Sequence, residues 1–217
     1  MSYQEVVSRA ASAAERAGRT PDSVTLVAVS KSKPISDIEA VYQMGHRDFG
    51  ENRAQEMAEK ATGLPGDIRW HFVGGLQANK ARMVRPITHL LHSMDRESLA
   101  AAWAKGNGLP PPVLLQVNTG REPQKSGVMP ERARETLERI VELGLEVRGL
   151  MAIPPISDDP EAQRPHFALL RHLRDDLSRD HPGIEELSMG MTDDFEVAVE
   201  EGSSIIRVGR AIFGERT

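Results

Sequence analysis

The chain of 217 residues contains 39% hydrophobic and 27% charged residues and has a net charge of −5. This length supports one well-packed core and falls short of two ordinary domains. The acidic balance argues against nucleic acid as the main partner, because phosphate neutralisation requires clustered Lys and Arg, and the absence of cysteine excludes disulfides, thiolate metal sites and a cysteine nucleophile.

The first predicted element is an amphipathic helix over residues 6–17, which ends at Gly18. The start of the chain lacks the basic and then apolar pattern of a signal peptide. No apolar run approaches the ~20 residues that span a bilayer. We therefore expect a cytoplasmic protein that does not enter a membrane.

Strands and helices then alternate along the rest of the chain. Strands are predicted at residues 25–31, 47–51, 69–74, 88–94, 112–118, 146–153, 186–189 and 204–213. Helices are predicted at residues 35–44, 53–61, 78–84, 97–105, 131–143, 161–179 and 194–201. Such alternation is typical of a parallel sheet covered by helices. Eight units favour a closed (β/α)8 TIM barrel as one α/β domain over residues 1–217. The rival open sheet usually carries a glycine fingerprint after its first strand, and here Ser-Lys-Ser-Lys-Pro follows instead.

Lys31 closes the most apolar predicted strand. A lysine at the end of a buried strand loses hydration, which favours its neutral amine and makes it able to form an imine with an aldehyde. Alternation places Val27, Val29 and Lys31 on one face, aimed into the barrel mouth if the valines point inward. Lys33 shares that parity, but it precedes Pro34, which holds it extended, so position favours Lys31. The alternative is a solvated loop lysine.

Polar residues also follow or interrupt other predicted strands. Asn52 follows the second strand, where it either lines the barrel mouth or caps the next helix. Arg207 lies within the eighth strand, and a buried guanidinium needs a partner, which either a carboxylate such as Glu51 or a ligand acceptor would supply. His71 and His92 lie in apolar strands without metal-binding spacing, so we interpret them as core or supporting groups.

The residues after the seventh and eighth strands match the common phosphate cradle of this fold. Ser188, Gly209 and Arg210 lie in these two segments, where glycines let the backbone approach closely and N–H groups and hydroxyls bind phosphate oxygens. Combined with an imine-forming Lys31, they describe a site for an aldehyde that carries a phosphate. Pyridoxal 5′-phosphate (PLP) fits best, and the substrates of a class I aldolase fit more loosely.

Eight ordered motifs then point to a known family. They are VAVSK (27–31), FGENRAQE (49–56), WHFVGGLQANK (70–80), HSMD (92–95), KSG (125–127), RGLMAIP (148–154), LSMGMTDD (187–194) and RVGRAIFG (207–214). Over nearly its whole length the chain resembles the pyridoxal phosphate homeostasis protein family, whose members look like the barrel domain of alanine racemase. Two positions depart from the family pattern: Gly75 replaces an expected proline, and Arg210 stands where a small hydroxyl residue is common.

The resemblance implies a role for each candidate residue. Lys31 would carry PLP as a Schiff base, with Asn52 beside the ring and Arg207 facing the pyridine nitrogen. Ser188, Gly209 and Arg210 would help to hold the phosphate, Arg210 through its backbone N–H with its side chain turned away. No metal ligand is expected.

The implied function is to bind PLP and to carry, buffer or deliver it inside the cell, with apo forms of PLP-dependent enzymes as candidate recipients, and without established catalytic turnover. An arginine at the pyridine nitrogen stays protonated, which leaves the ring a poor electron sink. The alternative is a PLP-dependent racemase or weak lyase, but racemases use a second base, commonly a tyrosine, and only Tyr3 and Tyr42 are present, both in predicted helices. Lys125 is a weaker candidate for taking the aldehyde during transfer, and we expect a monomer.

Overall fold

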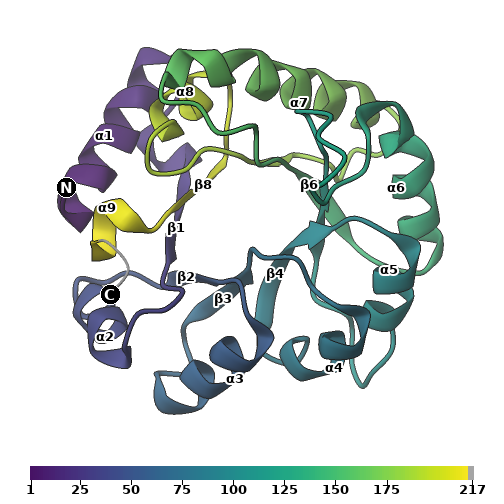
Figure 1. Cartoon of the computed structure of the whole chain (residues 1–217), viewed down its shortest axis with the longest axis horizontal. Coiled ribbons are helices and arrows are strands. Elements are labelled where there is room, and N and C mark those ends of the chain that lie inside the picture. Colours follow the sequence, from purple (N-terminus) through teal and green to yellow (C-terminus); the bar gives the residue numbers. More distant parts are fainter. Residues whose placement is uncertain (215–217) are drawn as a thin grey trace.

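The computed structural model describes residues 1–214 and shows a closed barrel of parallel strands ringed by helices (Figure 1). The strands follow one another around the barrel in chain order. They are β1 (Thr25–Val29), β2 (Asp48–Glu51), β3 (Arg69–Phe72), β4 (Thr88–Met94), β5 (Val113–Gln116), β6 (Val147–Met151), β7 (Glu186–Ser188) and β8 (Ile205–Val208). The predicted (β/α)8 barrel is therefore confirmed, and the first seven strands lie within two residues of their predicted bounds.

The helices cover the outside of the barrel (Figure 1). They are α1 (Tyr3–Arg16), α2 (Ile35–Gln43), α3 (Ala54–Gly63), α4 (Ala81–Val84), α5 (Glu97–Ala104), α6 (Ala133–Glu142), α7 (Arg164–Leu177), α8 (Phe195–Glu200) and α9 (Arg210–Phe213). The extra helix α1 packs against α8 and α9 through small residues such as Ala10 and Ala13, which allow close approach. Within residues 1–214, no helix is both long enough and apolar enough to cross a membrane.

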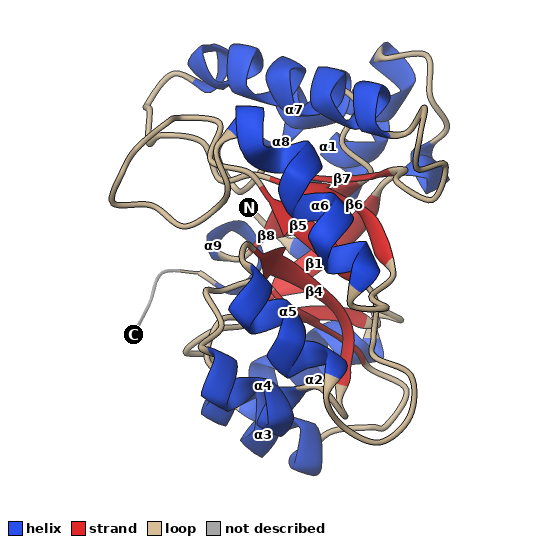
Figure 2. Cartoon of the chain, turned by 90° about the vertical axis from the view of Figure 1, so that its right-hand side faces the viewer, coloured by secondary structure: helices blue, strands red, loops and turns tan. Residues whose placement is uncertain are grey.

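The last strand was predicted to end at the wrong residue. Residues 204–213 were expected to form one strand, but β8 ends at Val208 and a helical turn follows. The pairing of β8 with β1 ends at Val208, which lies opposite Ala28. Beyond it the amides of Ile212 and Phe213 donate to the carbonyl of Gly209 instead, at 2.9 and 3.0 Å. This turn places α9 at the rim where the strands end (Figure 2).

The barrel interior is only partly apolar. One cluster inside it joins Val27, Leu90, Leu114, Met151 and Ile205, with Val29 packed against them. The two β1 valines therefore point inward, which meets the condition under which Lys31 was expected to face the barrel mouth. A larger core lies between the barrel and the helices and holds the bulkiest buried side chains, among them Trp103, Phe49, Phe72 and Phe167.

Candidate functional site

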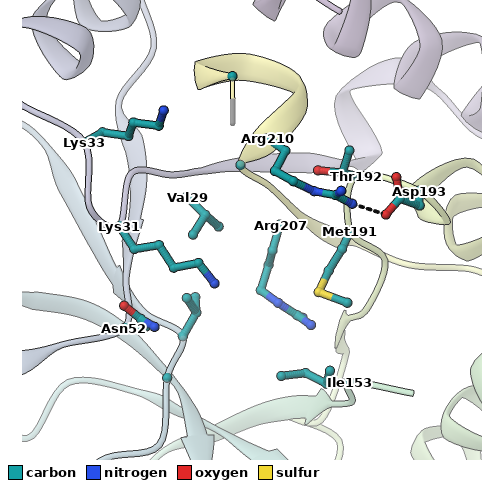
Figure 3. A pocket seen from close by; sticks show the side chains of 14 residues that line it. Val29, Lys31, Lys33, Asn52, Ile153, Met191, Thr192, Asp193, Arg207 and Arg210 are labelled. Atoms are coloured by element: carbon teal, nitrogen blue, oxygen red, sulfur yellow. Dashed lines mark hydrogen bonds and ion pairs between the residues drawn. The ribbon is translucent and has the colours of Figure 1, made fainter. Parts of the chain in front are cut away.

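A cavity of about 330 Å³ opens at the carboxyl ends of the strands. Five of the six residues predicted for the site line it: Lys31, Asn52, Arg207, Gly209 and Arg210. Figure 3 shows the side chains of Lys31 and Arg207 pointing toward a common space. The cavity therefore brings an amine and a guanidinium together where this fold places its chemistry.

Lys31 lies in a turn just beyond β1 rather than in the strand itself. The turn is closed by a hydrogen bond from the amide of Lys33 to the carbonyl of Ser30, at 3.0 Å, and Ser32 has a left-handed backbone with φ of 60°. Both lysines line the cavity, but Lys31 reaches toward its centre and Lys33 points away (Figure 3). The direction of the chain after the turn thus separates the two lysines that periodicity left equivalent.

The residues on each side of Lys31 are fixed by a buried ion-pair network. Glu51 is fully buried, and its Oε1 accepts from Ser30 Oγ and from Lys60 Nζ, each at 2.7 Å. Lys60 Nζ also donates to the carbonyl of Ser30 at 2.8 Å. On the other side, Glu56 Oε1 accepts from the amide of Ser32 at 2.5 Å and from Lys60 Nζ at 2.7 Å.

This network corrects one of the two partners considered for Arg207. Glu51 pairs with Lys60 rather than with Arg207. Burial raises the pKa of Glu51, and the hydrogen bonds from Lys60 and Ser30 act against that rise. Sequence reasoning missed Lys60, because a lysine four residues after Glu56 on a polar helix is typical of an exposed ion pair.

Asn52 lines the cavity beside Lys31, and Gly74 on the neighbouring loop makes room for it. A Cβ atom at residue 74 would lie 2.5 to 2.8 Å from three atoms of Asn52, closer than nonbonded atoms approach. Any side chain at position 74 would therefore displace Asn52. The predicted alternative, a helix cap, is not observed, because Arg53 is the residue before α3.

Arg207 forms part of the cavity wall and is only 4% exposed. Its Nη1 donates to Ser188 Oγ at 2.6 Å, and its Nη2 donates to the carbonyl of Ala152 at 3.0 Å. Burial lowers the pKa of Arg207 to about 10, and the charge of Asp194 acts in the opposite direction. The guanidinium is therefore charged at neutral pH and held in one orientation.

Ser188 is not among the residues that line the cavity. It is fully buried at the end of β7, where its hydroxyl contacts Arg207 and His92. The chain then turns at Gly190, which has a φ of 92° and little room for a Cβ atom because Ala198 would lie 2.5 Å away. This turn carries Thr192 to the cavity instead. A hydroxyl therefore lines the cavity at Thr192, four residues after Ser188.

Two carboxylates near the rim, Asp193 and Asp194, each have a polar partner. The side chain of Arg210 pairs with Asp193 at the cavity edge (Figure 3). Burial raises the pKa of Asp194, whose Oδ1 accepts from the amide of Met191 at 2.6 Å. Each of the two acids therefore has a hydrogen-bond or ion-pair partner close by at this edge of the cavity.

Comparisons with known proteins decide the family. The sequence model of the family described as "Alanine racemase, N-terminal domain" matches residues 4–217. A protein of Aquifex aeolicus named pyridoxal phosphate homeostasis protein is 44% identical over 97% of this chain and 95% of its own length. The chain belongs to the pyridoxal phosphate homeostasis protein family.

Solved structures agree with this membership. PipY of Synechococcus elongatus, whose structure is described as having PLP bound, is 38% identical and superposes with a TM-score of 0.81 over 96% of this chain and all of that one. Alanine racemase of Corynebacterium glutamicum shares the fold, with a TM-score of 0.74 at 16% identity, and the match covers 97% of this chain and 61% of the racemase chain.

Three further residues of this pyridoxal phosphate homeostasis protein family member bear on the site. Lys125 is held at the rim by Glu122 Oε2 at 2.6 Å and by the carbonyl of Pro154 at 3.1 Å. The rings of His71 and His92 are hydrogen-bonded to each other. Across residues 1–214, no group of three or more His, Asp or Glu side chains is arranged to hold a metal ion.

Proposed function

We propose that this chain binds pyridoxal 5′-phosphate covalently at Lys31 and carries, buffers and delivers it as part of PLP homeostasis. The observation that supports this most directly is the position of Lys31 opposite the charged, buried Arg207 in one cavity (Figure 3). The Lys31 amine and the aldehyde would condense to an imine with loss of water, a reversible link that suits storage and release.

The residues present fit this ligand. The cavity volume lies at the small end of the range for ligand pockets. On a pyridine ring the aldehyde carbon and the ring nitrogen lie opposite each other, so a ligand fixed at Lys31 directs its nitrogen away from that amine, toward Arg207. A Cβ atom at Gly209 would lie 3.0 Å from the carbonyl of Val29, so glycine lets the end of β8 lie close to the end of β1. Gly209 and Thr192 both line the cavity, where their polar groups would hold the phosphate.

The covalent link is tested by mixing the protein with PLP and recording its visible absorption. We expect a band that disappears on borohydride treatment, with the mass of the reduced ligand on the peptide containing Lys31. Pyridoxal without phosphate is the matched control and should bind more weakly, because it cannot use the rim at Thr192 and Gly209. Absence of the band at saturating PLP would refute the proposal.

The carrier role is tested on the same sample. Protein loaded with PLP and freed of excess ligand should restore activity to an apo form of a PLP-dependent enzyme. The borohydride-reduced protein, whose link cannot reverse, should restore none. Equal restoration by both would mean that the activity came from unbound PLP.

We further propose that the protein has no racemase function. Arg207, with a pKa of about 10, donates at neutral pH and leaves a ring nitrogen unprotonated, which makes the ring a poor electron sink. Both tyrosines are engaged elsewhere: Tyr3 with His46 at 3.2 Å and Tyr42 with Asp67 at 2.7 Å. We expect conversion of L- to D-alanine no faster than with free PLP, measured by chiral chromatography. A turnover number near 1 s⁻¹ or above, as in ordinary enzymes, would contradict this.

A further inference from the structure

A continuous chain of hydrogen bonds crosses the barrel interior from the cavity to the opposite end. Arg207 Nη1 lies 2.6 Å from Ser188 Oγ, and that oxygen lies 2.8 Å from His92 Nδ1. His92 Nε2 lies 2.9 Å from His71 Nδ1, and His71 Nε2 lies 3.1 Å from Asp48 Oδ1. The five residues come from β8, β7, β4, β3 and β2, so the chain passes through the middle of the barrel rather than along one strand.

This chain of hydrogen bonds is buried, and packing alone does not explain it. His92 and Ser188 are fully buried, and His71 is 2% exposed. Apolar side chains fill the remainder of the interior, including Leu90 and Leu114 on the strands beside them. Buried polar groups are costly unless each is hydrogen-bonded, and these are. An apolar filling would meet the packing need, so the polar chain calls for a different explanation.

The two ends of the chain fix the direction of every hydrogen bond. A guanidinium only donates, and an ionised carboxylate only accepts. Burial alone would raise the pKa of Asp48, but hydrogen bonds from His71 and from Arg69, at the end of the barrel away from the cavity, hold it well below its ordinary value. Asp48 is therefore an acceptor, and His71 donates to it from Nε2.

The same reasoning fixes His92. Burial lowers its pKa well below the ordinary value, and the charge of Arg207 acts in the same direction, so the ring carries one proton. Ser188 Oγ accepts from Arg207, so its own proton is donated to His92 Nδ1. The proton of His92 is then on Nε2, which donates to His71 Nδ1. If His92 instead carried its proton on Nδ1 and donated to Ser188, the Ser188 hydroxyl would donate to neither neighbour. A buried donor without an acceptor is unfavourable.

We propose that Asp48, His71, His92 and Ser188 are positioning residues for Arg207: the carboxylate at one end of the barrel sets the proton direction along the chain and fixes the guanidinium that faces the cavity at the other. The ligand part of this inference rests on the proposed function. In the loaded protein, Arg207 would donate to the ring nitrogen of a ligand fixed at Lys31. The chain of hydrogen bonds from Asp48 to Arg207, called the relay below, would act on that contact alone.

The proton positions are measured on the ligand-free protein. Long-range ¹H–¹⁵N correlation spectra distinguish the two neutral forms of each histidine. We expect both His71 and His92 to carry their proton on Nε2. A proton on His92 Nδ1 would overturn the relay, whatever the protein binds.

The effect on the ligand is measured with His92→Phe, which keeps a ring in the core and removes both hydrogen bonds. PLP binding should weaken roughly tenfold, the size expected for one charge-assisted hydrogen bond. Binding of 1-deazapyridoxal 5′-phosphate, which has carbon in place of the ring nitrogen, should not change. His89→Phe is the matched control, because exposed His89 lies on the same strand and its ring packs 5.5 Å from that of His71, yet it is outside the chain of hydrogen bonds.

Ser188→Ala provides a second variant in case His92→Phe folds poorly. It removes only the hydroxyl next to Arg207 and should discriminate between the two ligands in the same way. Equal losses for PLP and its deaza analogue in a folded variant would overturn the relay while leaving the proposed function intact. Failure of the unmodified protein to bind PLP at all would instead refute the proposed function and with it the ligand part of this inference.

Discussion

Replacing Lys31 by alanine should remove the entire visible absorption band that PLP gives with the unmodified protein. The amine of Lys31 points into the space opposite Arg207, and no other side chain that lines the cavity places an amine there (Figure 3). Without it the aldehyde has no partner for an imine, and only noncovalent contacts at Asn52, Arg207 and the rim remain. The band and the borohydride-trapped mass should both be lost.

Lys33→Ala is the matched control for this experiment. Lys33 lies in the same turn and lines the same cavity, but its side chain points away from the centre (Figure 3). We expect Lys33→Ala to keep the band, and Lys125→Ala to keep it as well, because Lys125 is held at the rim by Glu122. A band that persists in Lys31→Ala and disappears in Lys33→Ala would move the covalent site to Lys33.

Strand periodicity and chain order were sufficient to predict the barrel and to place Val27, Val29 and Lys31 on one face of β1. Val27 and Val29 alternate with outward residues, and that pattern is a local property of a strand. The same rule could not distinguish Lys31 from Lys33, because both lie beyond the last paired residue of β1. A turn, with its left-handed residue Ser32, decides their directions.

The parts of the site that the sequence did not reveal depend on contacts between distant segments. Ser188 was placed at the phosphate because it ends a strand, yet its side chain enters the interior and meets His92, 96 residues away. Thr192 reaches the cavity only because of the turn at Gly190. Glu51 is neutralised by Lys60 rather than Arg207, which follows from the packing of α3 on β2 and cannot be read from either segment alone.

The buried pair of Glu51 and Lys60 carries the second large expected effect. Lys60→Met should lower the free energy of unfolding by about 3–5 kcal/mol, because it leaves the Glu51 carboxylate buried without a counter-charge. Glu51 Oε2 already has no hydrogen-bond partner among the described residues, so solvent gives little compensation. The measurement is urea unfolding at pH 8. Lys105→Met, which removes an exposed lysine, should change stability by no more than about 0.5 kcal/mol.

The pH dependence and a double variant separate the lost charge pair from lost packing. A carboxylate whose pKa is raised in the folded state, as burial raises that of Glu51, favours folding below its unfolded pKa of about 4.3 and loses that contribution as pH rises through the folded value. Removing Lys60 raises the folded pKa further, so the deficit of Lys60→Met should grow between pH 5 and pH 8. Adding Glu51→Gln should recover part of it at pH 8, because no buried charge remains. A deficit that is independent of pH and unchanged in the double variant would assign the loss to the methylene contacts of Lys60 instead.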